Sequence, residues 1–160
     1  RIDSQDNNSA LINIFGGKMT TFRQLSEEVT NKVGSILGEK KSPWTSDVHL
    51  PGGDFSLTEK TKIVDGLAKE YDYLDVDYIH CLFSLYGTRV EYILKNVSSI
   101  DDLGLHFGRD LYQVEVDYLM QEEFALYPED VLERRTKLYL FLDYDKIESL
   151  DNYMQKKKEG

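Results

Sequence analysis

The chain has 160 residues, enough for one domain with a buried core. Its 41% hydrophobic and 30% charged residues are typical of a soluble globular protein, and no apolar run approaches the roughly 20 residues that span a bilayer. The formal net charge of -10 argues against nucleic acid as a partner, and the single cysteine excludes an intrachain disulfide and favours a cytoplasmic location.

The N-terminal segment combines a polar start with one short strand. RIDSQDNNSA predicts a loop or an edge segment, and Leu11 to Phe15 predict a largely buried strand that ends at glycines. A single strand must pair with a sheet, and the remaining sequence shows no convincing second strand. We therefore expect a piece cut from a longer protein, with residues 1–20 mobile or re-paired in the isolated chain.

Helical periodicity dominates the rest of the chain. A first helix is predicted to open at a capping box of Thr21 and Gln24 and to end at Gly38. After a loop over residues 40–54, a capping box of Ser56 and Glu59 opens the next helix. Further helices are predicted at Asp77–Tyr86, at Val90–Leu94, at Tyr112–Phe124 with Phe124 on its apolar stripe, from Pro128, and at Tyr144–Met154, with a loop at residues 101–108. The predicted fold class is mainly α, an orthogonal multi-helix domain preceded by one short β-strand.

The stretch FGGKMTT joins the predicted strand to the first helix. A nucleotide P-loop is excluded, because Ile12 and Met19 stand where that motif requires a glycine and a hydroxyl residue. A more general device remains, in which backbone N–H groups at a glycine turn and the start of a helix face an anionic or polar group. From spacing alone, a tight turn with a solvated Lys18 is an equal alternative.

The histidines and one acidic pair do not form a metal site. His49, His80 and His106 lie on separate predicted elements, without a partner ligand at suitable spacing, so they are predicted to be core or surface histidines. Asp75 and Asp77 do not fit an EF-hand loop and are interpreted as helix-capping acids.

Two basic stretches also have ordinary interpretations. Arg134 and Arg135 have the chemistry to bind a phosphate or carboxylate, but internal salt bridges, for example to Glu122 or Glu123, are favoured on so acidic a domain. Lys156 to Lys158 are predicted to form a solvated tail.

A set of ordered motifs resembles a known family. The motifs are FGGKMTTFR at residues 15–23, Trp44 followed by LPGG at 50–53, YG at 86–87, DLGLHF at 102–107, YQVEVDYL at 112–119 and DVLERRTKL at 130–138. In this order and spacing they resemble the C-terminal part of the FAD-dependent, membrane-associated glycerol-3-phosphate dehydrogenases.

The resemblance implies an activity for a longer protein. Members oxidise sn-glycerol 3-phosphate to dihydroxyacetone phosphate, pass a hydride to FAD and deliver the electrons to a membrane quinone. The GxGxxG fingerprint of their N-terminal FAD domain is not in this chain, so the fragment alone is expected neither to bind FAD nor to be active. The resemblance implies a cytoplasmic protein. Two points stay open: peripheral contact with the inner face of the membrane, and formation of a homodimer.

The resemblance also divides the chain and implies a site. Residues 1–20 would belong to the flavin/substrate domain, and residues 21–160 would form an α-helical cap. The backbone from Gly16 to Thr20 would bind the cofactor at the pyrimidine edge of the flavin. The residues of this segment are Gly16, Gly17, Lys18, Met19 and Thr20. Lys18 would also lie near the substrate. No catalytic residue and no metal ligand is assigned.

Two alternatives stay open on the sequence alone. One is a glycerol-3-phosphate oxidase, which gives its electrons to oxygen and forms peroxide. The other is a non-catalytic helical interaction module whose glycine turn binds no flavin. Two roles are possible for the helical region. It could dock against the FAD domain, against a second subunit or near the route of electrons to the membrane quinone, or it could serve as structural support alone.

Overall fold

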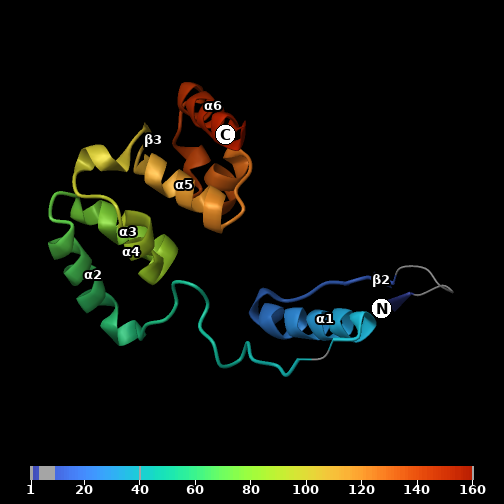
Figure 1. The fold of residues 1–160 in the computed structure, drawn as a ribbon. Helices are drawn as coiled ribbons and strands as arrows, with labels where there is room; N and C mark the ends of the chain where they lie inside the picture. The colour runs from blue at the N-terminus through green and yellow to red at the C-terminus, as the bar shows by residue number, and fades with distance from the viewer. Residues whose placement is uncertain (1, 4–9, 40, 160) are drawn as a thin grey trace. The chain divides into compact units, whose positions relative to one another are not determined.

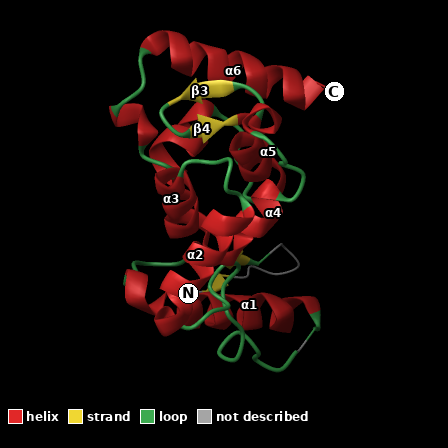
Figure 2. Cartoon of the chain, turned by 90° about the vertical axis from the view of Figure 1, so that its left-hand side faces the viewer, coloured by secondary structure: helices red, strands yellow, loops and turns green. Residues whose placement is uncertain are grey.

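The computed structural model describes residues 2–3, 10–39 and 41–159, and it is mainly helical, as predicted (Figures 1 and 2). The chain divides into two compact units, residues 1–49 and residues 50–160, which are described separately below. In the described part of the chain, no helix combines the length and apolar character needed to cross a membrane.

The first unit begins with a two-stranded antiparallel pairing. β1 (Ile2–Asp3) pairs with β2 (Leu11–Ile12), with Ile2 opposite Ile12 and Asp3 opposite Leu11. The prediction that the chain contains no partner strand is therefore wrong, and the strand is shorter than the predicted Leu11–Phe15. The partner was missed because two residues are too few for an alternating pattern.

A helix follows this pairing. A 3-10 turn, η1 (Met19–Thr21), leads into α1 (Phe22–Leu37), which ends at a left-handed Gly38, as predicted. The capping box predicted for Thr21 and Gln24 is wrong, because the Thr21 hydroxyl instead donates to the Lys18 carbonyl at 3.1 Å.

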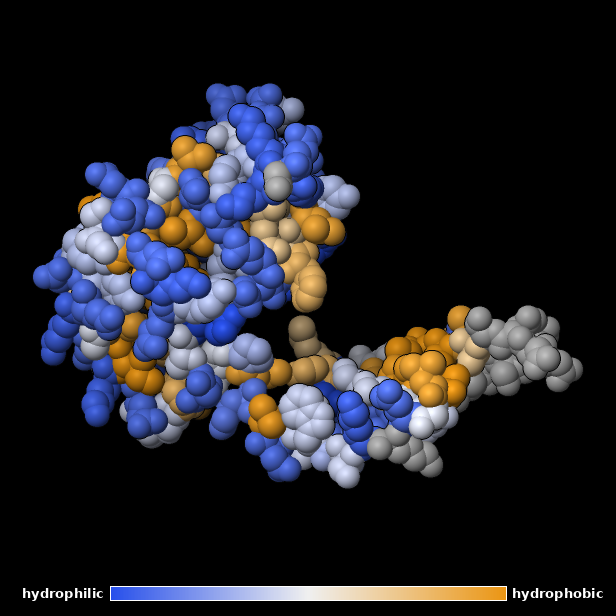
Figure 3. All heavy atoms as spheres, in the orientation of Figure 1, coloured by the Kyte–Doolittle hydropathy of each residue, from blue (hydrophilic) through white to orange (hydrophobic). Residues whose placement is uncertain are grey.

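The described residues of the first unit form no core of their own. Every described residue from 10 to 39 and from 41 to 49 is at least partly exposed. The large apolar side chains that are exposed in this unit are Leu11, Ile14, Phe15, Met19, Phe22, Val33, Ile36, Leu37, Trp44 and Val48. On the face drawn in Figure 3, hydrophobic surface gathers around β2 and the end of α1. This amount of exposed apolar surface is typical of a segment that another part of a protein covers.

The second unit contains the remaining elements. They are η2 (Leu57–Glu59), α2 (Lys60–Glu70), α3 (Val76–Tyr86), η3 (Gly87–Arg89), α4 (Val90–Leu94), η4 (Ile100–Leu103), β3 (His106–Gly108), β4 (Leu111–Tyr112), α5 (Gln113–Glu122), the π-helix η5 (Asp130–Arg135), η6 (Leu138–Leu140) and α6 (Tyr144–Glu159). α2 and α3 pack together, and α6 lies against β3 (Figure 2).

The hydrophobic core lies entirely in the second unit. The apolar faces predicted for the helices of this unit are confirmed, because their side chains are buried. These are Val64, Leu67, Tyr71, Ile79, Leu82, Phe83, Tyr86, Val116, Leu119, Leu150 and Met154. The Ser56–Glu59 capping box is also confirmed, and the Asp75 carboxylate accepts the Asp77 backbone N–H at 2.7 Å at the start of α3.

Three predictions for this unit are wrong. The region predicted as a loop at 101–108 holds a 3-10 turn and strand β3, which pairs with β4. α5 ends at Glu122, so Phe124 is not on its stripe: the Phe124 side chain is 87% exposed and its φ is 58°. Lys156 to Lys158 form the last turn of α6 rather than a tail, and Lys157 pairs with Asp117 at 3.1 Å.

The interpretation of the paired arginines is confirmed. Residues 128–135 are helical, beginning at Pro128 as predicted. Within this segment Arg134 pairs with Asp130, and Arg135 pairs with Glu123 at 2.6 Å. Both guanidinium groups are therefore used in internal ion pairs.

Candidate functional site

The predicted site residues lie in one continuous turn. Gly16 and Gly17 both have positive φ, 72° and 148°, and Lys18 then returns to an extended conformation at the start of η1. A side chain at Gly17 would press on Leu25 of α1, 3.0 Å from the position of its Cβ. The glycine pair therefore allows the chain to reverse close to the helix and keeps the backbone uncovered.

The chemistry of this turn is that of a hydrogen-bond donor. The first N–H groups of a helix have no acceptor within the helix, and they carry partial positive charge. The residues from Gly16 to Thr20 are exposed, and the Lys18 ammonium forms no hydrogen bond or ion pair with any residue that the structure describes. The Lys18 carbonyl accepts the Thr21 N–H at 3.0 Å, which fixes the turn to the helix start. Backbone N–H groups and a cation thus belong to the same exposed turn, a combination suited to an anionic or polar group.

The other candidates from the sequence do not form a site. His49, His80 and His106 are exposed, and the His106 ring stacks on Tyr112 with ring centres 4.7 Å apart. Among the residues that the structure describes, no group of His, Cys, Asp and Glu is arranged to hold a metal ion.

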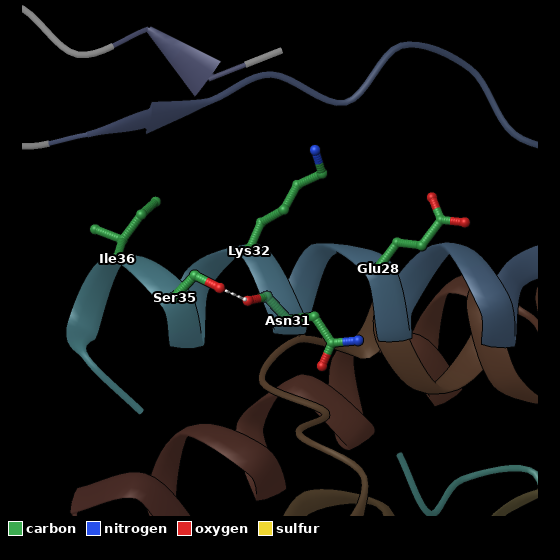
Figure 4. A pocket seen from close by; sticks show the side chains of 5 residues that line it. All are labelled: Glu28, Asn31, Lys32, Ser35 and Ile36. Atoms are coloured by element: carbon green, nitrogen blue, oxygen red, sulfur yellow. Dashed lines mark hydrogen bonds between the residues drawn. The ribbon is translucent and has the colours of Figure 1, made fainter. Parts of the chain in front are cut away.

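A depression beside α1 is also a poor candidate. It is lined by Glu28, Asn31, Lys32, Ser35 and Ile36 (Figure 4). Asn31 points to the opposite side of the helix from Lys32, and the Ser35 hydroxyl donates to the Asn31 carbonyl at 2.9 Å. The polar groups do not converge on one point, so this surface offers no built ligand site.

One buried polar residue was missed from the sequence. Glu115 of α5 is 3% exposed, and its carboxylate accepts the Tyr86 hydroxyl at 2.5 Å. Burial raises the pKa of Glu115 to about 7; the Tyr86 hydrogen bond opposes this rise, and Asp110 adds to it. The signal was present, since Glu115 shares a helix face with Leu119, four residues later.

Comparison with known proteins decides the family. A family model described as the C-terminal domain of alpha-glycerophosphate oxidase matches residues 43–155. The chain belongs to this family. The match starts just before the second unit begins and ends at residue 155, within α6.

Curated relatives extend the similarity into the first unit. The chain is 38% identical over 145 residues to a glycerol-3-phosphate dehydrogenase of Pseudomonas aeruginosa, a match that covers 91% of this chain and 28% of the relative. It is 37% identical over 132 residues to D-erythritol 1-phosphate dehydrogenase of Brucella abortus, covering 82% and 26%. It is 29% identical over 153 residues to the aerobic glycerol-3-phosphate dehydrogenase of Escherichia coli, covering 96% and 30%.

These matches bear on the glycine turn. A contiguous match over 96% of the chain includes Gly16 to Thr20, whereas the family model starts after them. The chain spans less than a third of the length of the curated relatives it matches.

Proposed function

We propose that the chain is the C-terminal part of an FAD-dependent glycerol-3-phosphate dehydrogenase and is inactive alone. The observation that carries this proposal is the uncovered donor turn from Gly16 to Thr20, in a chain that belongs to the alpha-glycerophosphate oxidase family. Residues 1–20 would belong to the flavin/substrate domain and residues 21–160 to the cap. The boundary between the two compact units lies between His49 and Leu50, after the boundary proposed at residue 20. The division into a flavin/substrate domain and a cap therefore stays a prediction.

The residues of the turn fit a flavin cofactor. FAD supplies the hydride acceptor for the oxidation of the substrate alcohol when it is bound. The exposed backbone from Gly16 to Thr20 would donate to the edge of the flavin where negative charge develops on reduction. The Lys18 ammonium pairs with none of the described residues and would be available to hold the phosphate or the oxygen of the substrate.

The partners of the whole protein are also part of the proposal. They are its own N-terminal FAD domain, glycerol 3-phosphate and a quinone acceptor, with a peripheral location at the cytoplasmic face of the membrane. The apolar surface of the first unit supports the first of these, because it requires a cover.

Two alternatives have specific support. The family description names an oxidase, which favours oxygen as the electron acceptor. The Brucella relative is named for erythritol 1-phosphate, which favours a longer polyol phosphate as the substrate. Both keep the same chemistry at the turn, a phosphate-bearing alcohol beside a flavin.

The test compares this chain with the longer product of its gene. We expect the longer protein to show a flavin absorption spectrum and to oxidise glycerol 3-phosphate with a quinone analogue, and the 160-residue chain to do neither. Erythritol 1-phosphate assayed in parallel, and peroxide measured in air, distinguish the two alternatives. A longer product without flavin would contradict the proposal and favour a non-catalytic helical module.

A substitution tests the turn itself. Lys18→Met in the longer protein should lower kcat/KM for glycerol 3-phosphate by about tenfold or more, since a hydrogen bond to a charged group contributes about 1.5–3 kcal/mol. Lys32→Met is the matched control, an exposed lysine on the same unit. Equal kcat/KM in both variants would remove Lys18 from the site.

A further inference from the structure

Two glycines far apart in sequence hold two backbone segments in direct contact. A methyl group placed on Gly87 would overlap the carbonyl of Gly52, and one placed on Gly52 would overlap the carbonyl of Tyr86. Both glycines have positive φ, 83° at Gly52 and 56° at Gly87. The approach is reciprocal, so neither position accepts a side chain without moving the other segment.

Further contacts flank this glycine pair. The Thr88 backbone N–H donates to the Gly52 carbonyl at 3.2 Å, and the Thr88 hydroxyl donates to the Asp54 carboxylate. The Phe55 ring packs on Phe83 of α3, with ring centres 5.1 Å apart. We call Gly52, Gly87 and the Asp54–Thr88 bond the glycine clasp.

The clasp lies where the chain enters the second unit. Its Gly52 side follows residues 38–51, and the described part of this segment forms no helix or strand. Its Gly87 side directly follows Tyr86, whose buried hydroxyl is bonded to Glu115 of α5. The clasp therefore fixes the incoming chain to a helix end that is itself fixed in the core.

We infer that the glycine clasp is a positioning device for the site-bearing turn. By fixing the point at which residues 38–51 join the second unit, it shortens the free chain that leads to the turn from Gly16 to Thr20, and so restricts the motion of this turn. This inference rests on the proposed function. If the clasp were only a structural contact, its loss would lower the stability of the cap and change nothing else.

The experiment uses the longer gene product with Gly87→Ala or Gly52→Ala. Gly66→Ala is the matched control: a methyl group there meets no atom within 4 Å, and its φ is unexceptional. The rate of trypsin cleavage after the exposed Lys41 measures how accessible residues 38–51, the linker, are to the protease. The kcat and KM for glycerol 3-phosphate measure the effect on the proposed site.

We expect both clasp variants to be cleaved after Lys41 roughly tenfold faster than the wild type, which corresponds to about 1.4 kcal/mol of lost local stability. Their kcat/KM should also fall by about tenfold or more, since small misplacements of a site are costly. The control should match the wild type in both measurements.

Two results would overturn the inference. One is a clasp variant that unfolds at lower temperature but keeps wild-type cleavage and kinetics well below that temperature. The other is faster cleavage with unchanged kcat/KM, which would leave the clasp without an effect on the site.

The experiment also covers two other outcomes: alanine variants that do not fold, and a longer protein that binds no flavin. If the alanine variants do not fold, Thr88→Val removes the bond to Asp54 while keeping the side-chain shape, and the same expectations and refutations apply. If the longer protein binds no flavin, the proposed function fails and the positioning role fails with it, whereas the cleavage rates still show whether the clasp holds the linker.

Discussion

Glu115 carries a buried carboxyl group in the second unit. The Tyr86 hydroxyl donates to it, and burial raises the pKa of Tyr86 far above its ordinary value as well, so this tyrosine stays protonated. The hydroxyl of Tyr78, on the same helix as Tyr86, is buried without a partner among the described residues, and burial also raises its pKa. At this point of the second unit, uncharged forms are therefore favoured.

The raised pKa of Glu115 predicts a pH dependence of stability. Its folded-state pKa of about 7 lies above its ordinary value of 4.5, so the folded protein retains a proton that the unfolded chain releases between these values. The stabilisation from this group is complete below about pH 4.5 and is lost as the pH rises through about 7, a change of about 3 kcal/mol.

Denaturant unfolding of the chain at a series of pH values measures this effect. Glu115→Gln should flatten the dependence between pH 4.5 and 7 and should unfold at higher denaturant concentration than the wild type at pH 8. Glu148→Gln, at an exposed position of α6, is the control and should keep the wild-type curve. A Glu115→Gln curve parallel to the wild type would show that the carboxyl stays charged.

At the scale of elements, the helix starts show which local signals were reliable. Ser56 and Glu59 form the predicted capping box, because Ser56 itself has an extended conformation and lies just before the helical turn. Thr21 and Gln24 have the same spacing but form no box. A 3-10 turn already begins at Met19, so Thr21 is inside a helical turn and bonds backwards. The residue types did not distinguish these backbone conformations.

The Ser56 box should contribute measurably to stability. Ser56→Ala removes the acceptor for the Thr58 N–H and should lower the free energy of unfolding by about 1 kcal/mol. Ser84→Ala, an exposed serine within α3, should change it by less than about half as much. Denaturant titration compares the two, and equal effects would mean that the box contributes nothing beyond helix propensity.

The elements that were not predicted share a physical cause. β3 and β4 have three and two residues, too few for an alternating apolar pattern, and their pairing depends on packing under α6. The left-handed Phe124 was missed because glycine is the usual residue at such a helix end. Apolar residues that recur every helical turn, by contrast, predicted α1 to α6 from the sequence, although the apolar face of α1 is not buried among the described residues.

At the scale of the whole molecule, the two units differ in how they are stabilised. The second unit has a continuous core, whereas no described residue of the first unit is buried. The loop predicted over residues 40–54 contains the boundary, but charged and apolar residues are mixed on both sides of His49, so composition did not show that only the second unit has a core. The sequence predicted an exposed glycine turn from Gly16 to Thr20, and its binding of a flavin stays a proposal.

This difference predicts unequal hydrogen exchange in the 160-residue chain. Amides of Ile12 and Ile14 should exchange with little protection, while those of Ile79 and Leu82 should exchange only on global unfolding. Exchange measured by NMR on a dilute sample tests this. Protection at Ile12 equal to that at Ile79 would show that the first unit is stable without a cover.

The glycine clasp has a consequence for how this family can change over time. At each of its two glycines, the group that a new side chain would strike is a main-chain carbonyl, which every residue possesses. A larger residue at one position cannot be compensated by a smaller one at the other, as it is in a hydrophobic core. We therefore expect both glycines to be retained together in descendants of this protein, or lost together where residues 38–51 take another route.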